Sequence, residues 1–167
     1  MATNDEWAKG YCEQARVDLQ ATQILVRKSG VDSTCCMLFQ MVFEKIAKAA
    51  LIQSECVTVD EARKTHAGAT KMVKAIGNQR AHLRGEGIDP TTEALSLVEE
   101  LEKAHPQITA DGPHLEYPWE DTTTREIKWP ERHLEVVRRI GDPLTGRGAE
   151  LLKLADQLVR NFKKIFP

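Results

Sequence analysis

Three polar residues recur at helical spacing inside an otherwise apolar stretch, residues 37–53 (MLFQMVFEKIAKAALIQ). Gln40, Glu44 and Lys48 follow one another at intervals of four, so on a helix they form one polar stripe. Glu44 preceding Lys48 is the favourable order for a helical ion pair. Lys45 points about 100° away from the stripe. The stripe is either the solvated edge of a core helix or a functional site, and spacing alone favours the solvated edge.

Motifs for phosphate, metal or acyl chemistry are absent from the rest of the sequence. It contains no GxGxxG or GxxxxGKS/T frame, no HExxH and no GxSxG. The cysteines Cys12, Cys35, Cys36 and Cys56 have no CxxC spacing, so we expect inert buried thiols in a reducing cytoplasm. The sequence therefore predicts no metal site and no cofactor.

Composition indicates an ordinary globular protein. The 167 residues predict a single domain, 1–167, and a net charge of -2 gives no general attraction to nucleic acid or anionic membrane. The first residues do not resemble a signal peptide, and no apolar run reaches the ~20 residues of a membrane span, so we expect a cytoplasmic protein. An RNA-binding patch is the less favoured use of the basic residues near the C-terminus. These are Arg138, Arg139, Arg147, Lys153, Arg160, Lys163 and Lys164.

Helical periodicity runs through nearly every segment. A first helix is expected from about residue 3 to 29, opened by a capping box of Thr3 and Glu6. A second follows from Asp32 or Ser33 to about Ser54, and it is apolar enough to be central.

Further helices are expected later in the chain. Thr65 is a good N-cap for a third, and Asp89 with Pro90 for a fourth that stops before residue 105. A short helical piece is expected at 133–139 and a last helix from about 142 to 166. The sequence thus predicts an all-α fold, an antiparallel up-and-down bundle of four to five helices. Residues 105–132, which hold four prolines and two tryptophans, predict an ordered insertion before the last helix.

The polar stripe belongs to a wider pattern, which resembles the HEPN family (higher eukaryotes and prokaryotes nucleotide-binding). The resemblance spans about residues 7–165. Its motifs are Ala15, Asp18, Leu19 and Ala21 in the first helix; Gln40, Glu44-Lys45 and Lys48-Ala49 in the second; Thr65-His66; and Tyr117-Pro118 before the last helix. The resemblance implies a helical bundle that is often a homodimer. Many members are metal-independent ribonucleases, and others bind nucleotides or act beside a nucleotidyltransferase.

The ribonuclease members use an arginine and a histidine separated by four to six residues, and that pair is missing here. None of the five histidines has an arginine at this spacing before it; Arg125 and His133 are too far apart and are separated by Pro130. Glu116 also stands where many members carry the arginine of an RYP motif. Metal-free RNA cleavage needs an acid or base and a cation beside the phosphate, so this departure favours a protein that is not an enzyme but leaves the question open.

The favoured hypothesis is a non-catalytic HEPN-like module that binds a nucleotide or a protein partner, such as a nucleotidyltransferase. Lys45 and Lys48 would contact phosphate, with Glu44 orienting Lys48. Alternatives are a toxin-like ribonuclease with other catalytic residues, such as His82 and Arg80, and a purely structural dimerisation unit. A homodimer is expected because the second and last helices carry more apolar surface than one bundle seam needs. The candidate contacts are Gln40, Glu44, Lys45, Lys48, His66, Tyr117 and Trp119.

Overall fold

The computed structural model describes residues 2–109 and 112–167 and is helical throughout most of them. The predicted all-α fold is confirmed: the described residues form ten helices and one hairpin of two short strands. The longer helices are α1 (Asn4–Ser29), α2 (Ser33–Gln53), α4 (Ala69–Asn78), α6 (Thr92–Lys103) and α9 (Arg147–Arg160). The shorter elements are α3 (Val59–Lys64), α5 (Arg80–Gly85), β1 (Trp119–Glu120), β2 (Ile127–Lys128), α7 (Pro130–His133), α8 (Glu135–Gly141) and α10 (Phe162–Ile165).

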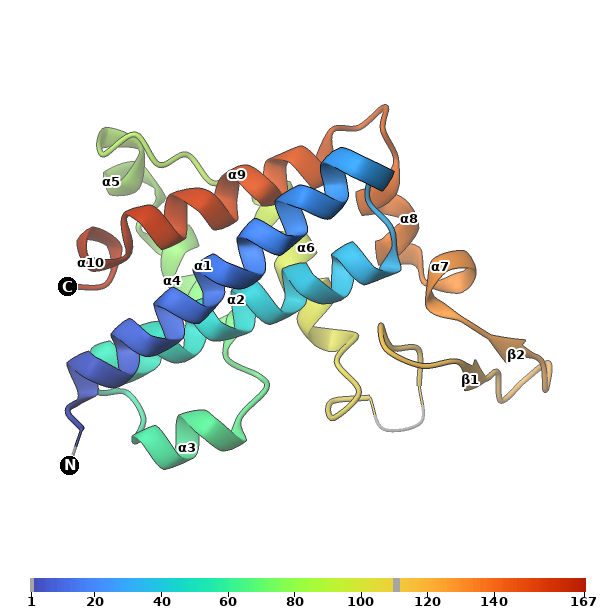
Figure 1. Cartoon of the computed structure of the whole chain (residues 1–167), viewed down its shortest axis with the longest axis horizontal. Helices are drawn as coiled ribbons and strands as arrows, with labels where there is room; N and C mark the ends of the chain where they lie inside the picture. Colours follow the sequence, from blue (N-terminus) through green and yellow to red (C-terminus); the bar gives the residue numbers. More distant parts are fainter. Residues whose placement is uncertain (1, 110–111) are drawn as a thin grey trace.

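Helices α1 and α2 form a long antiparallel pair, which lies side by side in Figure 1. The predicted capping box opens α1, since the Thr3 hydroxyl accepts from the amide of Glu6 and the Glu6 carboxylate accepts from that of Thr3. Gly30 ends α1 with φ 79°, a conformation that favours glycine. Asp32 then caps α2 as expected, accepting from the amide of Cys35.

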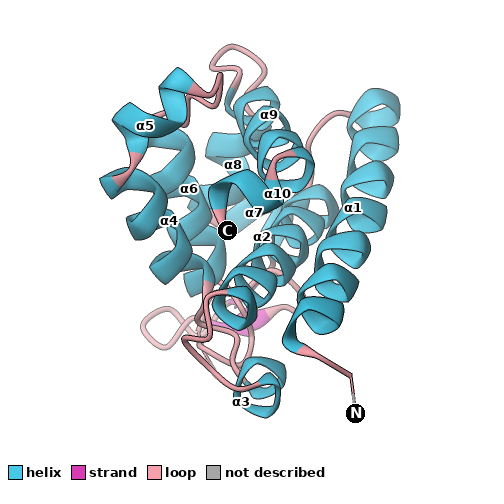
Figure 2. Cartoon of the chain, turned by 90° about the vertical axis from the view of Figure 1, so that its left-hand side faces the viewer, coloured by secondary structure: helices cyan, strands magenta, loops and turns pink. Residues whose placement is uncertain are grey.

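Helix α2 is the centre of the molecule. Most of its residues are buried, and it contacts α1, α3, α4, α6, α8 and α9. Figure 2 shows α4 and α6 on the side of α2 opposite α1, with α9 lying across the top. The side chains at the heart of the core include Phe39, Phe43, Ile46, Leu97 and Leu158. A helix that is apolar nearly all round is stable only when it is enclosed in this way.

Two predicted helix starts were misplaced. Thr65 ends α3 instead of opening the next helix, and α4 begins only after Gly68. Thr91, not Asp89, caps α6, because its hydroxyl accepts from the amide of Ala94. Asp89 is instead bonded to Arg84.

Two short helices were not predicted, and the last helix begins later than expected. Helix α3 has its own capping box, Thr58 with Glu61, and α5 follows α4 after a single residue, Gln79. Asp142 precedes a turn, so α9 starts only at Arg147 and breaks at Asn161 before α10. The expected piece around residues 133–139 is the end of α7 together with α8.

The predicted insertion, residues 105–132, is ordered by a few specific contacts in its described part. The amide of Leu115 donates to the carbonyl of Ala104, which holds the insertion against the end of α6. Strands β1 and β2 then pair antiparallel, with Trp119 opposite Lys128. Trp119 packs against the core. In the described residues, no helix is both long and apolar enough to cross a membrane.

Candidate functional site

The polar stripe of α2 is a buried hydrogen-bonded network and not a solvated edge. Gln40 and Lys48 are only 5% and 6% exposed. The Gln40 amide donates to Glu44 Oε2 at 3.0 Å, and the Lys48 ammonium lies 2.8 Å from Glu44 Oε1. Glu44 is therefore the centre of the network, and it is bonded along its own helix in both directions.

Two histidines complete this network from other parts of the chain. His66, between α3 and α4, places Nδ1 3.1 Å from Glu44 Oε1, and His105, just after α6, places Nε2 3.7 Å from Glu44 Oε2. Their rings are stacked, with centroids 4.4 Å apart and planes inclined by 19°. We refer to Glu44, Lys48, His66 and His105 as the α2 cluster. His105 was missing from the predicted site because only tertiary packing brings it to Glu44.

Glu44 and Lys48 form an ion pair at the centre of the α2 cluster. Burial alone would raise the pKa of Glu44, but the hydrogen bond and charge of Lys48 outweigh it, so the pKa lies below its ordinary value. Burial lowers the pKa of His105 more than the nearby Glu44 carboxylate raises it. At neutral pH Glu44 is therefore an anion, and His105 is uncharged. Lys48 is the counter-ion of Glu44, so this ion pair has no net positive charge to attract an anionic ligand.

The α2 cluster also lacks space for a nucleotide. The hollow bounded by Gln40, Phe43, Glu44 and His66 has a volume of about 0 Å³. Lys48 is occupied by Glu44 and lies 6.0 Å from the centre of the Tyr11 ring. The cluster therefore ties α2 to two other segments and offers hydrogen-bonding or ligating atoms, but it does not form a nucleotide cleft.

Lys45 belongs to another part of the molecule. Its ammonium is 2.6 Å from the Asp18 carboxylate of α1, and both side chains are largely buried. The contact joins α1 to α2. Two residues of the resemblance, Asp18 and Lys45, therefore meet in space, and the observed role of this pair is to join the two helices.

Tyr117 and Trp119 lie in the insertion near His114. The Tyr117 amide donates to His114 Nδ1, and the Tyr117 ring meets the His114 ring edge-on at 5.7 Å. The Trp119 ring is 6.5 Å from the same imidazole. Among the described contacts neither aromatic side chain reaches Glu44. Glu116 acts electrostatically on His105, because its carboxylate is among the charges that raise the pKa of that imidazole.

Several basic residues near the C-terminus are neutralised by carboxylates. Arg139 bonds to both Glu93 and Glu100, and Arg147 also bonds to Glu93. Arg160 pairs with Asp156 on its own helix. Because these guanidinium groups are occupied, this region offers less free positive charge to a nucleic acid than the sequence alone indicates.

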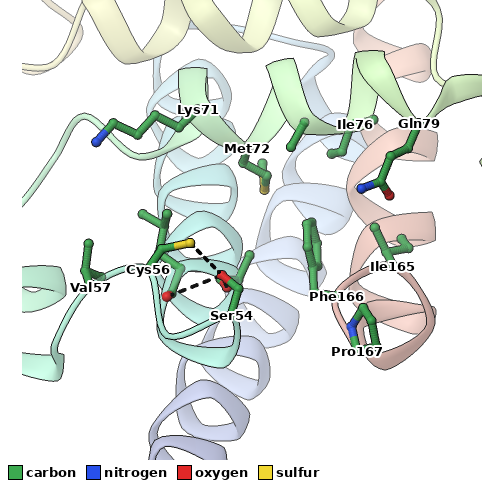
Figure 3. A pocket seen from close by; sticks show the side chains of 13 residues that line it. Ser54, Cys56, Val57, Lys71, Met72, Ile76, Gln79, Ile165, Phe166 and Pro167 are labelled. Atoms are coloured by element: carbon green, nitrogen blue, oxygen red, sulfur yellow. Dashed lines mark hydrogen bonds between the residues drawn. The ribbon is translucent and has the colours of Figure 1, made fainter.

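An open, apolar groove is formed by α2, α4 and the end of the chain. Its volume is about 520 Å³. Figure 3 shows Met72 and Ile76 of α4 on one side, Ile165 and Phe166 opposite, and Ser54 and Cys56 nearby. Lys71 stands at the rim with its ammonium directed outward. We call this feature the α2–α4 groove, and its lining also includes Ala50, Leu51, Val57, Ala75, Gln79 and Pro167.

The α2–α4 groove was not predicted, and its thiol corrects one expectation. Cys12, Cys35 and Cys36 are buried as expected, but Cys56 is exposed and lines the groove. Within α4, Met72 and Ile76 are buried, whereas Ala75 between them is exposed, and the sequence alone does not distinguish these positions. The other wall comes from residues 165–167, and no sequence pattern connects these to α4.

Comparison with known proteins does not add a relative. No family model, no curated protein and no solved structure matches this chain. Any proposal about function therefore depends on the α2 cluster, the α2–α4 groove and the HEPN resemblance of the short motifs.

Proposed function

We propose that this protein is a non-catalytic helical module of the HEPN type that binds a protein partner through the α2–α4 groove. The groove itself carries the proposal. Its volume of about 520 Å³ and its apolar lining are typical of a surface that accepts side chains of a partner. The α2 cluster, in contrast, is closed and its Lys48 is paired with Glu44, which makes a nucleotide the less favoured ligand.

The chemistry of the groove indicates an amphipathic helix with acidic residues at its edge. Met72, Ala75 and Ile76 of α4, with Gln79 at its end, line one wall. Met72 and Ile76 are buried at its base, whereas Ala75 and Gln79, four residues apart, are exposed and would meet a second helix. Lys71 stands at the rim, and Lys74 is exposed on the same helix. In the described part of the chain neither lysine forms a salt bridge, so both are free to face acidic residues of a partner. The HEPN resemblance adds a nucleotidyltransferase as a candidate for that partner.

The proposal is tested with a blocking variant and a matched control. Ala75 is exposed in the groove, so Ala75→Arg should fill the groove without disturbing the core. Ala21 is exposed on α1, outside the groove lining, so Ala21→Arg adds the same side chain elsewhere. A partner captured from the source organism and then purified should bind the wild type and Ala21→Arg equally. It should bind Ala75→Arg at least tenfold more weakly, which is a loss of about 1.4 kcal/mol.

Three outcomes would overturn this proposal. Equal binding of the partner by wild type and Ala75→Arg would place the interface elsewhere. A wild type that is a dimer by light scattering, with a monomeric Ala75→Arg, would make a second copy of this chain the occupant. Saturable ATP binding by calorimetry that is lost in Lys48→Ala, together with no partner, would make the protein a nucleotide-binding module.

A ribonuclease is the second candidate, and one observation favours it. His66 and His105 are stacked beside the Lys48 ammonium, and two imidazoles with a cation are the groups that metal-free RNA cleavage uses. In this candidate, His66 and His105 take the place of the catalytic residues suggested by the sequence, Arg80 and His82. Arg80 donates a hydrogen bond to Thr92 and is less available for RNA. Purified wild type in a metal chelator should then cut RNA, and His66→Ala should not; an inactive wild type would remove this candidate.

A further inference from the structure

Glu44, His66 and His105 converge from three separate segments of the chain. Glu44 lies in the middle of α2, His66 between α3 and α4, and His105 just after the end of α6. Their nearest ligand atoms, one carboxylate oxygen and two imidazole nitrogens, all lie within 4.8 Å of one another. The three residues lie too far apart in the sequence to form a recognisable metal-binding motif, so no metal site was predicted.

We propose that Glu44, His66 and His105 bind a divalent transition metal ion of the Zn²⁺ type. Two imidazoles and one carboxylate form a ligand set that suits zinc and leaves a fourth position for water or a ligand. Tetrahedral bonds of about 2.1 Å separate neighbouring ligand atoms by roughly 3.4 Å. The observed separations involve both carboxylate oxygens of Glu44. Oε1 lies 3.1 Å from His66 Nδ1 and Oε2 lies 3.7 Å from His105 Nε2, values on either side of that separation.

The residues around the three ligands orient and shield them, as expected for a metal site. The Gln40 amide donates to Glu44 Oε2 at 3.0 Å and so orients the carboxylate, as residues behind metal ligands commonly do. The side chains of Glu44 and His105 are only 14% and 10% exposed, whereas that of His66 is 22% exposed. The open coordination position would therefore be on the His66 side, where solvent reaches the cluster.

The Lys48 ammonium competes with the metal ion for the Glu44 carboxylate. Its ammonium lies 2.8 Å from Glu44 Oε1, so it supplies the positive charge that a metal ion would bring. The metal would displace the ammonium toward the Tyr11 ring, whose centre is 6.0 Å away and whose face can hold a cation. Removal of the Lys48 charge should therefore strengthen metal binding, which an ordinary structural network does not predict.

His105 would exchange one hydrogen bond for the metal. The amide of Gln107 donates to His105 Nδ1, so the neutral ring carries its proton on Nε2, the atom that faces Glu44. On coordination the proton leaves Nε2, a proton is taken up at Nδ1, and the Gln107 contact is lost. Glu44 and His66 are thus the ligands available first, and His105 completes the set.

The test is titration of the metal-free protein with Zn²⁺ alone, in a Cys56→Ser background so that the exposed thiol cannot compete. We expect one ion per chain by calorimetry and visible absorption typical of a four-coordinate site when Co²⁺ replaces Zn²⁺. Lys48→Met should bind roughly tenfold more tightly, because a unit positive charge beside the metal is removed. The same variant should lose thermal stability without metal and regain it with Zn²⁺.

Matched histidine variants separate this site from adventitious binding. His66→Ala should abolish binding, whereas His82→Ala, an exposed histidine on α5, should bind as the wild type does. Circular dichroism checks that each variant is folded. The proposal is overturned if the wild type shows no saturable Zn²⁺ binding, or if His66→Ala binds as tightly as His82→Ala. Neither result bears on the groove, because Ala75 and its neighbours take no part in the cluster.

Discussion

At the scale of single residues, the four thiols differ sharply in environment. Cys56 is exposed, whereas Cys12, Cys35 and Cys36 are buried. Burial raises the pKa of the Cys36 thiol well above its ordinary value, so it holds no reactive thiolate near neutral pH. We predict that a thiol reagent labels one cysteine rapidly in the native protein and four after denaturation. Fast labelling that persists in Cys56→Ser would contradict the assigned burial.

The pair of Asp18 and Lys45 provides a second prediction at this scale. Lys45→Met would leave the Asp18 carboxylate, whose side chain is only 11% exposed, without its cation. We expect the free energy of unfolding to fall by about 1–3 kcal/mol, the usual cost of an unsatisfied buried group. The double variant Asp18→Asn with Lys45→Met should lose less than the sum of its two single variants. Denaturant unfolding measures all four proteins, and strictly additive losses would show that the two side chains are not coupled.

At the scale of elements, the hairpin of β1 and β2 depends on one carboxylate. Asp121 accepts from the amides of Thr123 and Thr124 and pairs with Lys128 at 2.8 Å. The hydrogen bond from Lys128 and the two amides holds the pKa of Asp121 well below its ordinary value. Since the folded pKa is depressed, this contribution to stability is full above the ordinary pKa of about 3.9 and is lost as the pH falls below it.

We therefore predict that acid loosens this hairpin before the helical core. The amide NMR signals of Thr123 and Thr124 should move toward their unfolded positions as the pH falls below about 3.9. Asp121→Asn should show no such step, because asparagine does not titrate in this range. Signals that stay constant through the acid range in the wild type would contradict the role of the carboxylate.

Sequence patterns predicted elements best where the signal is local. The capping box of Thr3 and Glu6 and the cap at Asp32 placed α1 and α2 correctly, because both devices join residues three positions apart. The start of α6 was misplaced by two residues, since Asp89 and Thr91 are both good caps and only tertiary contacts distinguish them. Asp89 is bonded to Arg84, which leaves Thr91 to cap the helix.

At the scale of the whole molecule, the sites depend on segments that the sequence does not connect. The stripe of Gln40, Glu44 and Lys48 was visible from its spacing, but its burial follows from the helices around α2. His105 joins it only because α6 packs on α2. Likewise, α4 and Phe166 form the α2–α4 groove only in the folded chain. Periodicity identifies which face of a helix is apolar, but it does not identify the segment that covers that face.

Protection of Cys56 tests the central claim, partner binding in the groove, most directly. Cys56 lines the groove and the three other cysteines are buried, so fast thiol labelling reports on the surface around Cys56, which includes this end of the groove. With saturating purified partner, we predict that Cys56 is labelled at least about tenfold more slowly in the wild type and in Ala21→Arg. In Ala75→Arg the same partner concentration should slow labelling much less. If the bound partner leaves the labelling rate of wild-type Cys56 unchanged, the groove is not the binding surface.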